Sequence, residues 1–190
     1  WVVETMFGTP DDPKLPAAVL EDEELASIVS LDNLTLASGP EHVDGRGLYR
    51  TLCASCHGVT GNGRGPEGAL QTPYPRDYRM GVFKFKTTPR GSKPTKDDLK
   101  RLIKGGIAGT NMTDIQKLLE TEAFKRGNPS WMPKTITDAD IDALVDYVIY
   151  LSMRGEHERK QVDMGILDGI IEDDERLVNS TYGRQIGWAD

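Results

Sequence analysis

Hydrophobic residues recur at helical spacing in several stretches of the chain, and strand-like alternation is absent. The clearest stretch follows a capping box formed by Thr137 and Asp140, and we expect this helix to end at Gly155. Its apolar face consists of Ile141, Leu144, Val145, Val148 and Leu151. A second helix is predicted between a capping box at residues 95–98 and the glycine pair at residues 105–106. The pattern therefore predicts an all-α protein.

The remaining chain is less regular. Shorter helices are predicted around residues 21–30, from near Asp44 to residue 56, and over residues 113–125. Residues 58–94 are rich in glycine and proline, which predicts a long loop region that wraps around another part of the folded molecule. A loop of this length without elements of its own is usually functional or disordered. Residues 156–190 are charged and weakly amphipathic, so we expect a surface helix or a partner-binding tail there.

The composition of the chain shows a shortage of hydrophobic residues. Only 37% of the 190 residues are hydrophobic and 7% are aromatic, below the roughly 45–50% apolar content of globular domains on a slightly broader residue list. Either part of the chain lies outside a packed core, or a group other than side chains fills the core.

Charge and hydropathy exclude two classes of partner. The 23 basic and 30 acidic residues give a net charge of −7, so a basic face for nucleic acid is not expected. No run approaches the ~18 apolar residues of a membrane-spanning helix.

The two cysteines fall within one pentapeptide, Cys53-Ala54-Ser55-Cys56-His57. This C-x-x-C-H motif is the attachment site of c-type haem. Cysteines three residues apart on a helix share a face, so each thiol can form a thioether with a haem vinyl group. The adjacent histidine supplies an imidazole nitrogen to iron. The motif thus predicts one covalently bound haem c.

Two other uses of the cysteine pair fit less well. A thioredoxin-like site needs a βαβ context, and strand signals are missing. A structural zinc site needs about four ligands, but His42 and His157 are isolated and no second C-x-x-C is present.

The residues that flank the motif resemble those of class I cytochromes c. Glycine and tyrosine precede the first cysteine at Gly45 and Tyr49, a Gly-Asn-Gly-Arg-Gly-Pro run covers 61–66, and Ala-Leu-Val-Asp-Tyr-Val covers 143–148. The resemblance implies an all-α class I cytochrome c fold, with three to five helices wrapped around one covalently bound haem. It places the haem domain at 42–154, between an N-terminal extension at 1–41 and a C-terminal extension at 155–190.

The resemblance also assigns roles to single residues. In the family, a glycine and an aromatic residue of the first helix cross the last helix at a Leu/Tyr pair, which Gly45, Tyr49, Leu144 and Tyr147 match. A proline carbonyl accepts the other N–H of the haem histidine, and this role falls to Pro66 by resemblance. An ordinary turn proline is the alternative reading.

Two methionines compete for the sixth iron position, which a class I cytochrome c gives to methionine. Met112 ends the run Gly-Ile-Ala-Gly-Thr-Asn-Met, similar to a loop of bacterial members, whereas Met132 is followed by proline and lies five residues before Thr137. We prefer Met112 because more positions match, and residues 113–131 then form an insertion. Ligation by His42 is a weaker alternative.

Residues 75–86 resemble a loop in cytochrome c subunits of larger bacterial respiratory complexes. This likeness places Arg76, Tyr78 and Lys84 near the haem propionates, where charge-assisted hydrogen bonds hold carboxylates. Phe83 and Phe85 are expected to wall the haem. A solvated basic stretch with two core aromatic residues is an equal alternative.

These features predict one-electron transfer by a non-enzymatic haem protein with His57 and Met112 on iron. Such a protein is a periplasmic electron carrier or a haem subunit of a respiratory complex; the alternative is a haem protein with a labile or vacant sixth site, including a subunit of a haem enzyme. We expect redox partner proteins to dock through the two extensions. The resemblance implies a periplasmic location or an outward-facing one on a bacterial membrane. We also expect that a segment before Trp1 was removed. The sequence does not distinguish a signal from a membrane anchor there.

Overall fold

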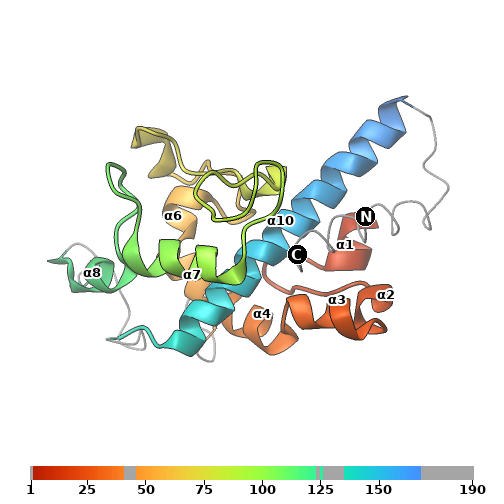
Figure 1. Ribbon diagram of the computed structural model, residues 1–190, viewed down its shortest axis with the longest axis horizontal. Coiled ribbons are helices and arrows are strands. Elements are labelled where there is room, and N and C mark those ends of the chain that lie inside the picture. The colour runs from red at the N-terminus through yellow and green to blue at the C-terminus, as the bar shows by residue number, and fades with distance from the viewer. Residues whose placement is uncertain (1, 41–45, 123–124, 126–134, 168–190) are drawn as a thin grey trace.

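The computed structural model describes residues 2–40, 46–122, 125 and 135–167, and every regular element in these ranges is helical (Figure 1). The one β-type contact among the described residues is an isolated bridge between Gly8 and Pro13. This agrees with the all-α fold expected from the hydrophobic pattern. None of the described helices is long and apolar enough to cross a membrane.

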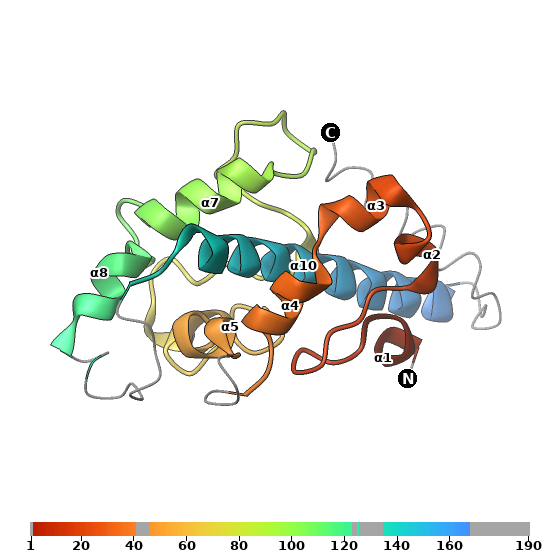
Figure 2. The same ribbon diagram turned by 90° about the horizontal axis from the view of Figure 1, so that it is seen from below.

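A single long helix, α10 (Asp138–Leu167), runs through the middle of the molecule, and the other elements pack around it (Figure 2). The predicted start is confirmed, because Asp140 N donates to Thr137 Oγ1 at 3.2 Å and Thr137 N donates to Asp140 Oδ2 at 2.8 Å. The predicted end is wrong, because the helix continues past Gly155. A Cβ at Gly155 would lie 2.5 Å from the Cα of Arg79. The glycine therefore permits a close backbone approach and does not end the helix.

Helix α7 (Lys96–Gly105) follows the prediction closely. Thr95 and Asp98 form the capping box, and Gly106 ends the helix with φ +68°. Helix α8 (Ile115–Glu120) is shorter than the stretch predicted at 113–125, of which residues 123–124 lie outside the described residues. Its N-cap is Asp114, whose side chain accepts from the N–H groups of residues 116 and 117.

The haem motif lies on two short helices, α5 (Leu48–Leu52) and α6 (Ala54–His57), which meet at Cys53. The predicted start at Asp44 and the glycine at residue 45 lie outside the described residues. The predicted aromatic contact with the last helix is confirmed, since the rings of Tyr49 and Tyr147 lie 4.8 Å apart and both are buried.

Residues 58–94 form the expected loop region, with only two short 3₁₀ segments, η1 (Gly68–Leu70) and η2 (Tyr78–Met80). In the view of Figure 1 this loop region lies on one side of α10 and the N-terminal segment on the other.

The N-terminal segment is the largest departure from expectation. It forms α1 (Val2–Phe7), α2 (Ala17–Leu20), α3 (Glu23–Ile28) and α4 (Leu31–Ala37). Phe7 and Leu34 are completely buried. Tyr150 Oη donates to the Phe7 carbonyl at 2.5 Å, and Tyr147 Oη donates to the Pro10 carbonyl at 2.5 Å. The segment expected to be an extension at 1–41 is thus, where described, part of the core packed on α10.

Candidate haem-attachment site

The C-x-x-C-H motif occupies one tight helical turn. His57 N donates to the Cys53 carbonyl at 2.8 Å, and the turn closes where Gly58 N donates to the Ala54 carbonyl at 2.8 Å. Gly58 has φ +75°, which ends the helix and turns the chain away. Both Cys53 and Cys56 are free thiols. One turn therefore presents two thiols and one imidazole from positions 53, 56 and 57.

Burial keeps both thiols protonated. It raises the pKa of Cys53 to about 12 and also raises the pKa of Cys56. Zinc binds the thiolate form of cysteine, and the described residues contain no group of three or more histidine, cysteine or acidic side chains that could hold a metal ion. The raised pKa values, with no further ligands grouped near the pair among the described residues, disfavour a zinc site here.

His57 is prepared to bind a metal through one defined nitrogen. Its Nδ1 lies 3.2 Å from the carbonyl oxygen of Arg76. A carbonyl can only accept, so Nδ1 carries the hydrogen and Nε2 presents a lone pair. Burial lowers the pKa of His57, which favours the neutral imidazole that ligation requires.

The carbonyl that holds the histidine corrects the role expected for Pro66. Pro66 is exposed, and among the described residues no hydrogen bond joins its backbone to His57. The chain on either side of it is bonded to α6: Gly65 N donates to the Cys56 carbonyl at 3.1 Å and Glu67 N donates to the Ser55 carbonyl at 2.9 Å. Gly63 has no side chain and lets residues 75–77 approach closely. That approach brings the Arg76 carbonyl to His57.

The structure places Tyr78 against the histidine. The two rings stack with centroids 4.6 Å apart and planes at 18°, and Tyr78 is buried. The ring of Phe83 stacks in turn on that of Tyr78, with their centroids 6.1 Å apart. Phe85 differs from its expected role as a wall, because it is 44% exposed and lies under the ammonium group of Lys84. Tyr78 and Phe83 thus form an apolar layer beside the histidine.

Arg76 and Lys84 lie together at one open cleft of about 500 Å³. Lys86 and Arg90, which the sequence analysis did not single out, also line it, and no carboxylate does among the described lining residues. Tyr78 is not among these residues. The signal for these two cations was their place in the same basic stretch, two and six residues after Lys84. Such a cluster suits anionic groups.

Met112 lies in the loop between α7 and α8 and is partly buried. Its N–H donates to Thr110 Oγ1 at 3.1 Å, and its carbonyl accepts from Ile107 N at 2.8 Å. The neighbouring Asn111 side chain donates to the Gln71 side chain, which joins this loop to the one that follows the haem motif. The competing residues Met132 and His42 lie outside the described residues.

A comparison with protein families places this site in a known class. The family model for cytochrome c matches residues 42–152, more than half of the chain. The chain belongs to the cytochrome c family. The match spans the haem motif, the loop region, α7 and the first half of α10, and membership implies a covalently bound haem c with iron. Two protonated thiols and a neutral histidine with an available Nε2 fit that group.

Other comparisons give less. No curated protein matches the chain. One solved structure matches, titled Kuenenia stuttgartiensis reducing HAO-like protein complex Kustc0457/Kustc0458. Identity to it is 28%, the TM-score is 0.44, and the match covers 55% of this chain and 39% of that chain. The chain thus spans well under half of that neighbour.

Proposed function

We propose that this cytochrome c is a monohaem electron-transfer protein with His57 and Met112 as the axial ligands of iron. The observation that carries the proposal is the state of His57, whose Nδ1 is held by the Arg76 carbonyl at 3.2 Å beside two protonated thiols. This arrangement selects one tautomer and strengthens the imidazole as a ligand before any metal is present.

Each residue of the site has a distinct task in this proposal. Cys53 and Cys56 would hold the haem through thioether bonds, and His57 would offer its imidazole to iron. When bound, the haem supplies an iron that gains and loses one electron. Tyr78 and Phe83 keep water away from the histidine, which lowers the solvent reorganisation that accompanies a change of charge.

Three cations of the cleft, Arg76, Lys84 and Arg90, are placed to receive carboxylates, and we assign the haem propionates to them. The lining contains no carboxylate among the described residues, which supports this assignment. The fourth cation, Lys86, instead donates to oxygen atoms of Thr88 and Pro89. In a chain with net charge −7, such a local excess of positive charge is unusual.

Met112 is proposed as the sixth ligand because its loop is bonded to the loop that follows the haem motif. A histidine and a methionine on iron leave no position for a substrate, so the protein acts as an electron carrier or haem subunit and not as an enzyme. A Met/His pair also raises the reduction potential. We place the protein in the periplasm or facing outward on a bacterial membrane, where its partners are redox proteins.

Absorption spectra test the proposal. Native and denatured protein, each reduced and oxidised, should show one thioether-bound haem per chain and, in the native ferric form, a methionine-to-iron charge-transfer band. Met112→Ala should abolish that band, whereas the control Met6→Ala, at a partly buried methionine of α1, should retain it. Retention of the band in Met112→Ala would exclude Met112. Rapid carbon monoxide binding to the reduced wild type would favour a vacant or labile sixth site.

A further inference from the structure

Residues 76–81 contact the haem histidine in two ways. The Arg76 carbonyl lies 3.2 Å from His57 Nδ1, and the Tyr78 ring stacks on the imidazole at 4.6 Å. The first contact fixes the tautomer and the second fixes the plane of the ring. The position of this segment therefore determines how His57 is oriented.

The other end of the segment is fastened by a buried ion pair. Lys93 Nζ donates to the Gly81 carbonyl at 2.9 Å and pairs with Glu156 Oε1 at 2.5 Å. The side chains of Lys93 and Glu156 are only 12% and 3% exposed. Ser152 Oγ also donates to Glu156 Oε1, at 3.1 Å. One carboxylate of α10 thus holds the lysine that holds the segment.

Two glycines let the segment lie directly on α10. A Cβ at Gly81 would be 2.1 Å from the Glu156 carboxyl, and one at Gly155 would be 2.5 Å from the Arg79 Cα. The chain at Gly81 has φ +63°, a conformation that glycine adopts without strain. Because both contacts are close, a shift of the ion pair must be passed on to residues 79–81.

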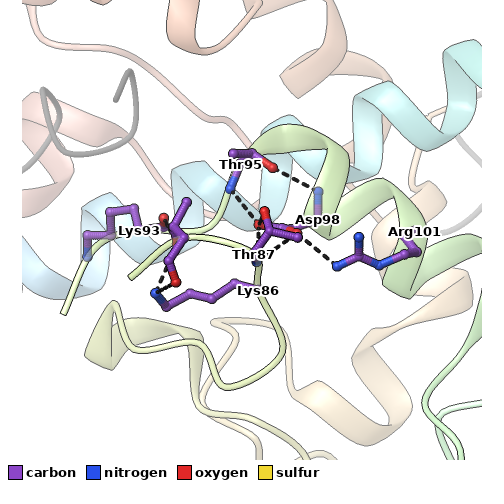
Figure 3. Close-up of polar contacts among 7 residues, drawn as sticks. Lys86, Thr87, Lys93, Thr95, Asp98 and Arg101 are labelled. Carbon is purple, nitrogen blue, oxygen red and sulfur yellow. Dashed lines mark hydrogen bonds and ion pairs between the residues drawn. The ribbon is translucent and has the colours of Figure 1, made fainter. Parts of the chain in front are cut away.

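Lys93 is itself held in place. Its carbonyl accepts from Thr88 Oγ1 at 2.7 Å, and the N–H groups of Thr87 and Thr95 each donate to the Asp98 carboxylate. Figure 3 shows Thr87 and Thr95 bonded to Asp98 at the start of α7, with Arg101 on the far side. The loop that carries the lysine is therefore anchored at both ends.

An ion pair at this depth needs an explanation other than stability. Desolvation of two charges offsets most of their attraction, so a buried pair adds little net stability, while removal of one partner is costly. Such a pair does select one arrangement of the groups that it joins. Glu156 lies beyond residue 152, where the cytochrome c match ends, and on the part of α10 that extends past Gly155.

We propose that Lys93 and Glu156 are positioning residues for the haem histidine, acting through residues 76–81. This role rests on the proposed function. When the pair is broken, the segment loosens, the Nδ1–H bond to the Arg76 carbonyl weakens, and His57 becomes a less basic ligand. A less basic histidine stabilises ferric iron less, so the reduction potential rises.

The test compares Lys93→Met with Lys100→Met in haem-loaded protein. Both remove a lysine that pairs with a carboxylate of α10, but the Lys100–Asp142 pair is partly exposed. Among the described residues, no hydrogen bond or ion pair joins it to residues 76–81. Two quantities are measured: the reduction potential, and the exchange rate of the His57 Nδ1 proton by NMR in the reduced state. Lys93→Met should raise the potential and speed the exchange about tenfold or more, and Lys100→Met should change neither.

A second variant keeps the test decisive if Lys93→Met fails to fold. Glu156→Gln retains the shape of the side chain and should move both quantities in the same direction by a smaller amount. Lower thermal stability with unchanged potential and exchange would overturn the positioning role alone. A wild-type protein without thioether-bound haem would overturn the proposed function, and this role with it.

Discussion

The side chain of Asn33 donates a 2.7 Å hydrogen bond to Asp146, joining α4 to α10 across 113 positions of sequence. The same carboxylate accepts from Ser30 N at 3.0 Å and pairs with Lys96 Nζ at 2.7 Å. Its side chain is almost fully buried. One residue of α10 thus binds the N-terminal segment on one side and the start of α7 on the other.

Loss of this carboxylate should destabilise the whole fold. Asp146→Ala leaves the donors on Ser30, Asn33 and Lys96 without their acceptor, and we expect a loss of about 3 kcal/mol in the free energy of unfolding. The control Asp142→Ala removes the half-exposed pair with Lys100 and should cost less than about 1 kcal/mol. Urea unfolding followed by circular dichroism gives both values. Equal losses would show that Asp146 has no special role.

The N-terminal segment should contribute directly to stability. Phe7 is fully buried, with its ring 6.5 Å from that of Tyr150 and 5.3 Å from that of His157. We expect Phe7→Ala to cost about 3–5 kcal/mol, the usual range for a large buried aromatic side chain. Val82→Ala, at an exposed position, should cost little. If Phe7→Ala, like Val82→Ala, leaves the thermal midpoint unchanged, the N-terminal segment is not part of the cooperative folding unit.

Stability should fall in mild acid because of His157. Burial lowers its pKa to about 4, and its Nε2 lies 2.7 Å from Gln161 Nε2. Below the ordinary histidine pKa of about 6.5, the unfolded chain binds a proton that the folded chain does not. The free energy of unfolding should therefore decrease as the pH falls from about 6.5 toward 4.

The variant His157→Gln isolates this contribution. Its unfolding free energy should depend less on pH between about 5 and 6.5, a window above the ordinary range of carboxylates. Burial also lowers the pKa of His57, so part of the slope should remain. A variant with the same slope as the wild type would show that His157 titrates normally in the folded protein.

Local signals in the sequence predicted much of the fold and the identity of the site. The caps at Thr95 and Thr137 depend on neighbours three residues away, and the C-x-x-C-H motif is contained in five residues, so both were readable without tertiary information. The N-terminal segment was misjudged because its four helices are short and prolines interrupt the sequence around them. Only the partners on α10 show that these residues are buried.

The acceptor of the His57 Nδ1 hydrogen was also predicted wrongly, because one backbone carbonyl can replace another in this role. Any carbonyl near His57 can accept its Nδ1 hydrogen, and sequence likeness pointed to Pro66. The structure uses Arg76, because the glycine at residue 63 lets a distant stretch of loop approach the histidine. The shortage of hydrophobic residues left open whether part of the chain lies outside the core, and the described part of the N-terminal segment is packed in it.

At Gly155, helix propensity and packing have opposite effects on the stability expected of an alanine variant. Alanine is favoured over glycine inside a helix by about 0.5–1 kcal/mol, but a Cβ at Gly155 would lie 2.3 Å from the Cβ of Arg79. We expect Gly155→Ala to destabilise the protein by about 1–3 kcal/mol, because the backbone of Arg79 must move. The matched control is Gly105→Ala in α7, where an added Cβ meets nothing within 4 Å. That variant should be neutral or slightly stabilised, since only propensity acts. Chemical unfolding of the two variants under one condition measures the difference, and a stabilised Gly155→Ala protein would mean that α10 and residues 78–80 are not in close contact.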